Sequence, residues 1–189
     1  QTVTSDATGE GNVQQVVAAR ATARGLYLEA FQVYRCAGLK EYMNEAIPLL
    51  ETFYRLWWED IEKFEVWEKK MQLFDKAFAK KFLHKQFNQS AWTFCNWVIN
   101  DAAYARINFP TPSMAKFQAF TAEHYPQAFK MMSAEYRAKA ASWFLKYKKN
   151  TERFVKGAGP KVPEGLAGQK AMVDKIDAAI KAYMPKTVN

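Results

Sequence analysis

The residues best suited to chemistry in this 189-residue chain are its two histidines, His84 and His124. A carboxylate-bridged di-iron site in a helical bundle places a Glu or Asp three residues before each histidine ligand. Those positions hold Lys81 and Thr121 instead. The sequence also lacks the His-Glu-x-x-His and Cys-x-x-Cys patterns that bind zinc. We therefore expect no metal site and no cofactor.

Groups for nucleophilic catalysis or phosphate binding are missing as well. The serines fall in no Gly-x-Ser-x-Gly sequence, which is the turn that exposes a catalytic serine in hydrolases. Glycines at 157 and 159 are not followed by Lys and Ser or Thr, and no strand is expected before them. Catalysis requires a positioned acid, base, nucleophile or metal. The sequence therefore predicts that the protein is not an enzyme.

The best candidate site is a run of cations towards the C-terminal part of the chain. Its members are Lys146, Lys148, Lys149, Arg153 and Lys156. Aromatic side chains lie between them, and this combination suits an anionic protein partner or anionic lipid head groups. The alternative is a helix end whose cations stabilise the negative end of the helix dipole. No RNA- or DNA-binding motif accompanies the run, so we expect no nucleic acid partner.

The net charge of +8 is unevenly distributed. Residues 1–101 carry 12 basic and 13 acidic groups, whereas residues 102–189 carry 15 basic and 6 acidic groups. A basic half of this kind can contact an acidic protein or an anionic surface. A solvated surface that favours solubility is the simpler explanation, and the sequence leaves both open.

One long helix, from Pro48 to about Phe87, is expected to position all other elements. Acidic residues precede basic ones along it, which complements the helix dipole and favours a single helix of about 40 residues. Large apolar residues recur every seven positions, and burial of each stabilises the fold by about 1.5–3 kcal/mol. This seam consists of Leu50, Trp57, Phe64, Met71 and Phe78.

The other segments also show helical periodicity, and none alternates as a strand would. A helix over 13–37 has a slim, alanine-rich middle that allows close approach of another helix, and Gly38 ends it. Ser90 is expected to cap a helix over 91–107, and Pro126 to start a new helix or kink an existing one. The prediction is an all-α, irregular bundle of about five or six helices built around the long one.

The chain divides into four parts on composition. Residues 1–11 are small and polar and form a flexible or extended arm, and residues 12–156 form the bundle. Residues 157–168 contain four glycines and two prolines and are expected to be a loop. Residues 169–189 form a C-terminal helix and tail.

Three local features bear on compartment. Cys36 and Cys95 lie in apolar helical contexts that suit free thiols, and a single bridge between them stays open. Asn88 begins an Asn-x-Ser triplet, which matters only in a secreted protein. The chain starts with Gln1 rather than Met, so we expect a processed start after removal of a signal or transit peptide.

The processed start, the basic C-terminal half and the aromatic residues on long helices resemble lineage-specific accessory subunits of mitochondrial inner-membrane complexes. The resemblance is one of composition and rests on no specific motif. It implies a non-catalytic structural subunit of the ATP synthase or a respiratory complex, with other protein subunits as partners. The alternative is a secreted or surface helical protein that binds lipid or haem, with the aromatic seam lining the cavity.

Overall fold

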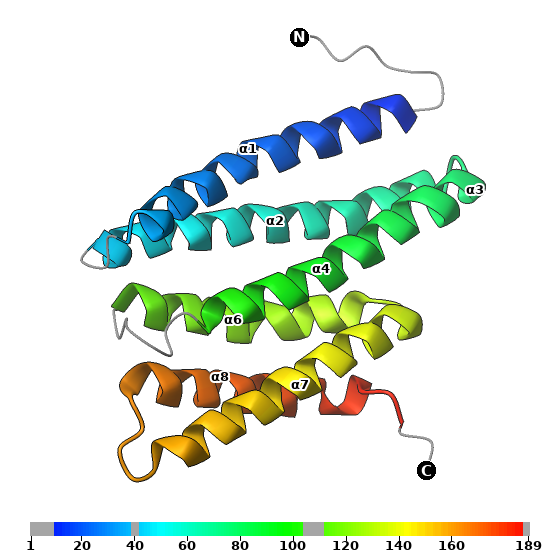
Figure 1. Cartoon of the computed structure of the whole chain (residues 1–189). Coiled ribbons are helices and arrows are strands. Elements are labelled where there is room, and N and C mark those ends of the chain that lie inside the picture. Colours follow the sequence, from blue (N-terminus) through cyan, green and yellow to red (C-terminus); the bar gives the residue numbers. More distant parts are fainter. Residues whose placement is uncertain (1–9, 39–41, 104–111, 187–189) are drawn as a thin grey trace.

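The computed structural model describes residues 10–38, 42–103 and 112–186, without the side chains of residues 10–13 and 82–83 (Figure 1). Most of the arm predicted over 1–11 lies outside the described residues, and residues 10 and 11 already belong to the first helix. Every regular element in the described part is helical, which confirms the all-α prediction.

Six long helices make up the described part of the chain. They are α1 (Glu10–Cys36), α2 (Met43–Met71), α4 (His84–Ala102), α6 (Pro112–Met131), α7 (Ala134–Ala158) and α8 (Glu164–Ile180). A helical turn, α3 (Lys76–Phe78), and a π-helical segment, η2 (Ala79–Leu83), lead into α4, and the 3₁₀ turn η3 (Lys181–Tyr183) follows α8. The number of helices agrees with the prediction.

The prediction of one helix of about 40 residues is wrong. The longest helix, α2, has 29 residues and ends at Met71, after which the chain reverses. The Asp75 N–H donates to the Met71 carbonyl at 2.7 Å, and the Asp75 carboxylate accepts from the Phe78 N–H at 3.0 Å. Asp75 thus caps a new helix, which the heptad pattern did not reveal. Reversal lets α4 pack back against α2, so the apolar seam is covered by the chain itself.

Several further boundaries differ from the prediction because the helices are longer than expected. Asn88 to Ser90 lie inside α4, so Ser90 is not a cap. No new helix starts at Pro126, which lies within α6, the second of the two predicted possibilities. The loop predicted over 157–168 is shorter, because α7 continues through Ala158 and α8 begins at Glu164. Gly38 does end α1 as predicted, with the positive φ of 65° that glycine adopts readily.

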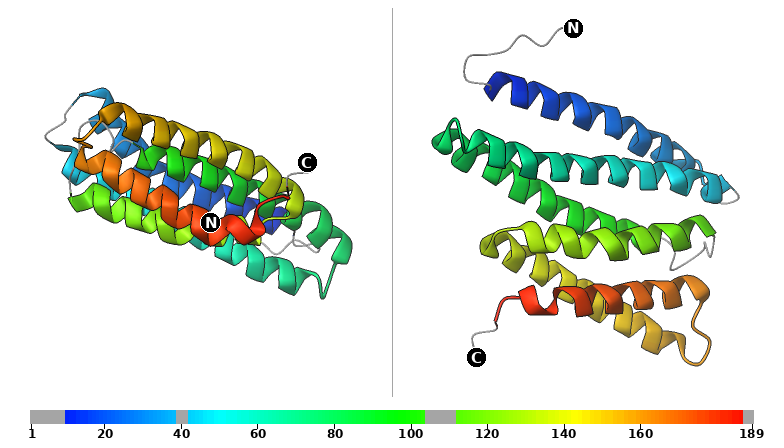
Figure 2. Two further views of the ribbon diagram at one scale, coloured as in Figure 1. Left: turned by 90° about the horizontal axis from the view of Figure 1, so that it is seen from below. Right: turned by 180° about the vertical axis from the view of Figure 1, so that it is seen from behind.

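The helices form a stack of three antiparallel pairs, α1 with α2, α4 with α6 and α7 with α8 (Figures 1 and 2). Helices α2, α6 and α8 pack side by side in one layer, and α4 and α7 lie across them in a second layer. Helix α1 lies at one end of the stack, where its main contacts are with α2. One side of α1 therefore has no neighbour in the described part of the chain.

The first half of the predicted seam forms the centre of the core. Leu50, Trp57 and Phe64 are buried, whereas Met71 and Phe78 are only partly so. Tyr54 stacks on Trp57 with ring centroids 6.1 Å apart and meets other helices through Phe94 of α4 and Phe117 of α6. The rings pack against one another and fill the interior.

Candidate interaction surfaces

Four of the five predicted site cations form one exposed stripe on α7. Lys146, Lys149, Arg153 and Lys156 follow one another at spacings of three, four and three residues, which places them on one helix face, and all four are exposed. Lys146 lies 5.8 Å from the centre of the exposed Trp143 ring. We call these four residues the α7 cation stripe.

The fifth predicted cation, Lys148, has a different role. It points towards α8, where its Nζ donates to the Asp177 carboxylate at 3.0 Å. That hydrogen bond raises the pKa of Lys148 above its ordinary value. Lys148 therefore joins two helices, and the structure does not bring it together with the α7 cation stripe.

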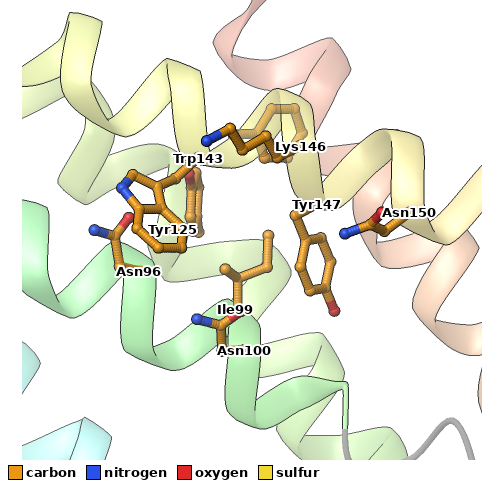
Figure 3. Close-up of a pocket in the computed structure, with 9 residues that line it drawn as sticks. Asn96, Ile99, Asn100, Tyr125, Trp143, Lys146, Tyr147 and Asn150 are labelled. Carbon is orange, nitrogen blue, oxygen red and sulfur yellow. The ribbon is translucent and has the colours of Figure 1, made fainter.

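A pocket of about 160 Å³ lies beside the stripe, between α4 and α7 (Figure 3). Asn96 and Asn100 of α4 face Trp143 and Tyr147 of α7 across it. The Asn96 Oδ1 atom is buried and has no hydrogen-bond partner among the described residues. Sites for cofactor-sized ligands usually measure about 300–1,000 Å³. This pocket is smaller than a haem or a lipid chain requires.

The two histidines lie apart and in different surroundings. His124 packs between Trp58 and Phe120, whose ring centres are 5.1 and 4.3 Å from its own, and burial lowers its pKa below the ordinary value. His84 lies at the start of α4, with its Nδ1 atom 3.3 Å from the Glu68 carboxylate. Among the described residues, no group of three His, Cys, Asp or Glu side chains could hold a metal ion.

The structure shows whether the two cysteines are bridged and how accessible Asn88, the residue of the glycosylation triplet, is. Cys95 is buried in α4 and Cys36 is exposed at the end of α1, and both thiols are free. Asn88 is 1% exposed, donates to the His84 carbonyl and accepts from the Ser133 N–H at 2.7 Å. An amide used inside the fold in this way is not accessible to a glycan.

A second exposed surface lies on α1, on the side away from α2. Its apolar residues follow one another at spacings of four, three, four and three, which is the spacing of a coiled-coil seam. Leu26 and Val33 are 62% and 67% exposed, and the alanines between them are small enough to let another helix approach closely. We call this surface the outer α1 stripe; it consists of Ala19, Ala23, Leu26, Ala30 and Val33.

The opposite side of α1 packs against the rest of the protein. Phe31 is buried against the core, and Leu28 and Val17 pack beside it. Arg20 and Arg24 reach from this inner side to the Asp60 carboxylate of α2, with Arg24 Nη1 at 2.6 Å from Oδ2. Helix α1 therefore carries apolar residues on two opposite faces, of which only one is covered. The alanine pattern predicted a close helix neighbour, but only the structure shows which face is left open.

Compared with known proteins, the sequence matches no protein-family model and has no detectable similarity to a characterised protein or to a solved structure. The fold defines the class, an all-α bundle of stacked helix pairs, and the surfaces above are the basis for functional inference. No helix in the described part of the chain has the length and apolar character needed to cross a membrane.

Proposed function

We propose that this protein is a non-catalytic structural subunit of a larger protein complex, which it joins through the outer α1 stripe. The observation that supports this proposal is the exposure of Leu26 and Val33 opposite the face of α1 that packs on α2. In stacked helical arrays the terminal helix normally turns a polar face outwards. A terminal helix with a second apolar face instead suits a position between two neighbours.

The spacing of the stripe favours a helix of another protein as the partner. A four-three repeat of small and aliphatic residues accepts a neighbouring helix along its whole length, in the manner of a coiled coil. The α7 cation stripe would supply a second contact, with an acidic partner or with anionic lipid head groups. On compositional resemblance, we propose a mitochondrial inner-membrane assembly, the ATP synthase or a respiratory complex, as the setting.

The alternative function, a carrier of lipid or haem, has less support. It requires the aromatic seam to line a cavity, yet Tyr54 and Trp57 pack directly against Phe94. The pocket between α4 and α7 is small and is lined by amides as well as rings. A larger cleft of about 540 Å³ lies between α2 and the start of α4, but it is lined by charged and polar side chains such as Glu68, Lys80 and His84 and not by the aromatic seam.

The test is a double substitution, Leu26→Glu with Val33→Glu, in a tagged chain returned to its native source. Each residue buried at an interface contributes about 1.5–3 kcal/mol, so recovery of co-purifying subunits should fall by at least about tenfold. The matched control is Ala171→Glu with Ala178→Glu, which adds the same charges at the same spacing to exposed positions of α8. The control should retain the partners.

The isolated wild-type chain should self-associate or aggregate, because the stripe is uncovered. Size-exclusion chromatography with light scattering measures this directly. A stable monomer that recovers no partner from the native source would contradict the proposal, as would full recovery of partners by the Leu26→Glu and Val33→Glu variant.

A further inference from the structure

The turn between α2 and α3 exposes two large apolar side chains that the fold does not use. Leu73 and Phe74 are 82% and 85% exposed, more than any other large hydrophobic residue in the described part of the chain. The turn is held by its backbone, since the Leu73 N–H donates to the Lys70 carbonyl at 3.2 Å and the Phe74 N–H to the Met71 carbonyl at 3.0 Å. Polar residues and glycine usually occupy such positions.

Lysines flank this apolar pair in the sequence, and two of them, Lys76 and Lys80, line an open cleft with Glu68 and His84. Between residues 69 and 85 the chain has six lysines and one acidic residue, Asp75. The carboxylate of Asp75 already accepts the Phe78 N–H as a helix cap. All six lysines are exposed: Lys69, Lys70, Lys76, Lys80, Lys81 and Lys85. We call them, together with Leu73 and Phe74, the hairpin tip.

The hairpin tip lies at an extreme end of the molecule. Figures 1 and 2 show the turn projecting past the ends of the neighbouring helices in all three views. Lys69 and Lys70 lie in the last turn of α2, and Leu73 and Phe74 follow in the turn directly after it. The acidic residues nearest to the tip are already engaged, Glu65 with Lys69 at 3.1 Å and Glu68 near His84 at 3.3 Å.

We infer that the hairpin tip is a docking site for an anionic lipid bilayer. Apolar side chains of interfacial segments enter about 5–10 Å below the head groups, and cations set one turn back remain at the level of the lipid phosphates. A nucleic acid would use rings that stack on bases, which Leu73 does not offer. An acidic protein would be held by the lysines but would not require two apolar residues at the projecting end.

This inference rests on residues separate from the outer α1 stripe, so the two proposals can fail independently. The full chain is floated on a density gradient with phosphatidylcholine vesicles that contain about 30 mol% phosphatidylserine, and with phosphatidylcholine vesicles alone, so that aggregated protein without lipid stays at the bottom. Wild-type protein should bind the anionic vesicles, with weaker binding as salt is raised. Leu73→Ser with Phe74→Ser should reduce the bound fraction by at least about tenfold at equal helix content by circular dichroism.

The matched control is Leu26→Ser with Val33→Ser, which removes two exposed apolar residues from α1. This variant should bind vesicles like the wild type, although it should weaken protein association if the proposed function is correct. A second readout is an environment-sensitive dye on Leu73→Cys in a Cys36→Ser background. Its emission should shift to the blue with anionic vesicles only.

Three results would overturn the inference. One is wild-type vesicle binding by the Leu73→Ser and Phe74→Ser variant. Another is loss of binding only when the α7 cation stripe is changed to glutamine. The third is binding of the tip to RNA or to an acidic protein without binding to either kind of vesicle.

Discussion

At the scale of single residues, Asp60 holds α1 against the rest of the molecule. Its side chain is 6% exposed and contacts both Arg20 and Arg24, and the Arg24 guanidinium lies 5.3 Å from the Trp57 ring centre. Asp60→Ala leaves two partly buried arginines without their acceptor. We expect a loss of about 3 kcal/mol in the free energy of unfolding, measured by urea denaturation.

The loss of stability in Asp60→Ala should affect α1 more than the other helices. Hydrogen exchange of α1 amides should accelerate in Asp60→Ala far more than exchange in α6. A triple variant, Asp60→Leu with Arg20→Met and Arg24→Met, should recover much of the stability because it removes all three charges together. Unchanged protection of α1 in Asp60→Ala would show that apolar packing alone docks this helix.

His124 makes stability depend on pH. Burial between Trp58 and Phe120 lowers its pKa, and Arg55 lowers it further, whereas Glu123 and Glu62 raise it. Below the ordinary pKa of about 6.5, the unfolded chain binds a proton that the folded chain does not. The free energy of unfolding should therefore fall as pH decreases from about 7 towards 5, until the lowered pKa is reached.

Thermal melts of wild type and His124→Leu between about pH 7 and pH 5 measure this effect. The leucine variant should lose less stability over that range, since it has no group to titrate and fits an apolar setting. If wild type and His124→Leu lost the same stability over this pH range, titratable groups other than His124 would be responsible for the pH dependence.

At the scale of elements, Asp75 determines where the hairpin turns. Its carboxylate accepts the Phe78 N–H at 3.0 Å, so Asp75→Ala should lower the free energy of unfolding by about 1 kcal/mol. Asp75→Asn keeps an acceptor oxygen and should lose little, which makes it the control in the same denaturation series. An equal loss of unfolding free energy in both variants would indicate that the negative charge of Asp75, rather than its role as a helix cap, stabilises the fold.

The element boundaries show what local pattern can predict. Gly38 ends α1 because a left-handed conformation follows from residue type. The prediction of a single helix of about 40 residues was wrong. Heptad spacing and charge order fit one continuous helix and two antiparallel helices that pack on each other equally well. The signal that could have found the turn was Asp75, a strong capping residue three positions before Phe78.

At the scale of the whole molecule, the stack of helix pairs decides which faces stay open. The α7 cation stripe was visible in the sequence, because its four residues share a helix face at predictable spacing. The sequence grouped Lys148 with them and could not show that its partner, Asp177, lies on another helix. The hairpin tip was missed, because Leu73 and Phe74 were assigned to a continuous helix.

The sequence by itself determined the helical content, the burial of Leu50, Trp57 and Phe64, and the lack of known catalytic and metal-binding motifs, because these follow from residue type and local spacing. Only the tertiary structure decided that the chain reverses after Met71 and that Leu26 and Val33 face outwards. Helical hydrogen bonds form within a segment, whereas the covered face of each helix depends on which distant segment buries the most apolar area against it.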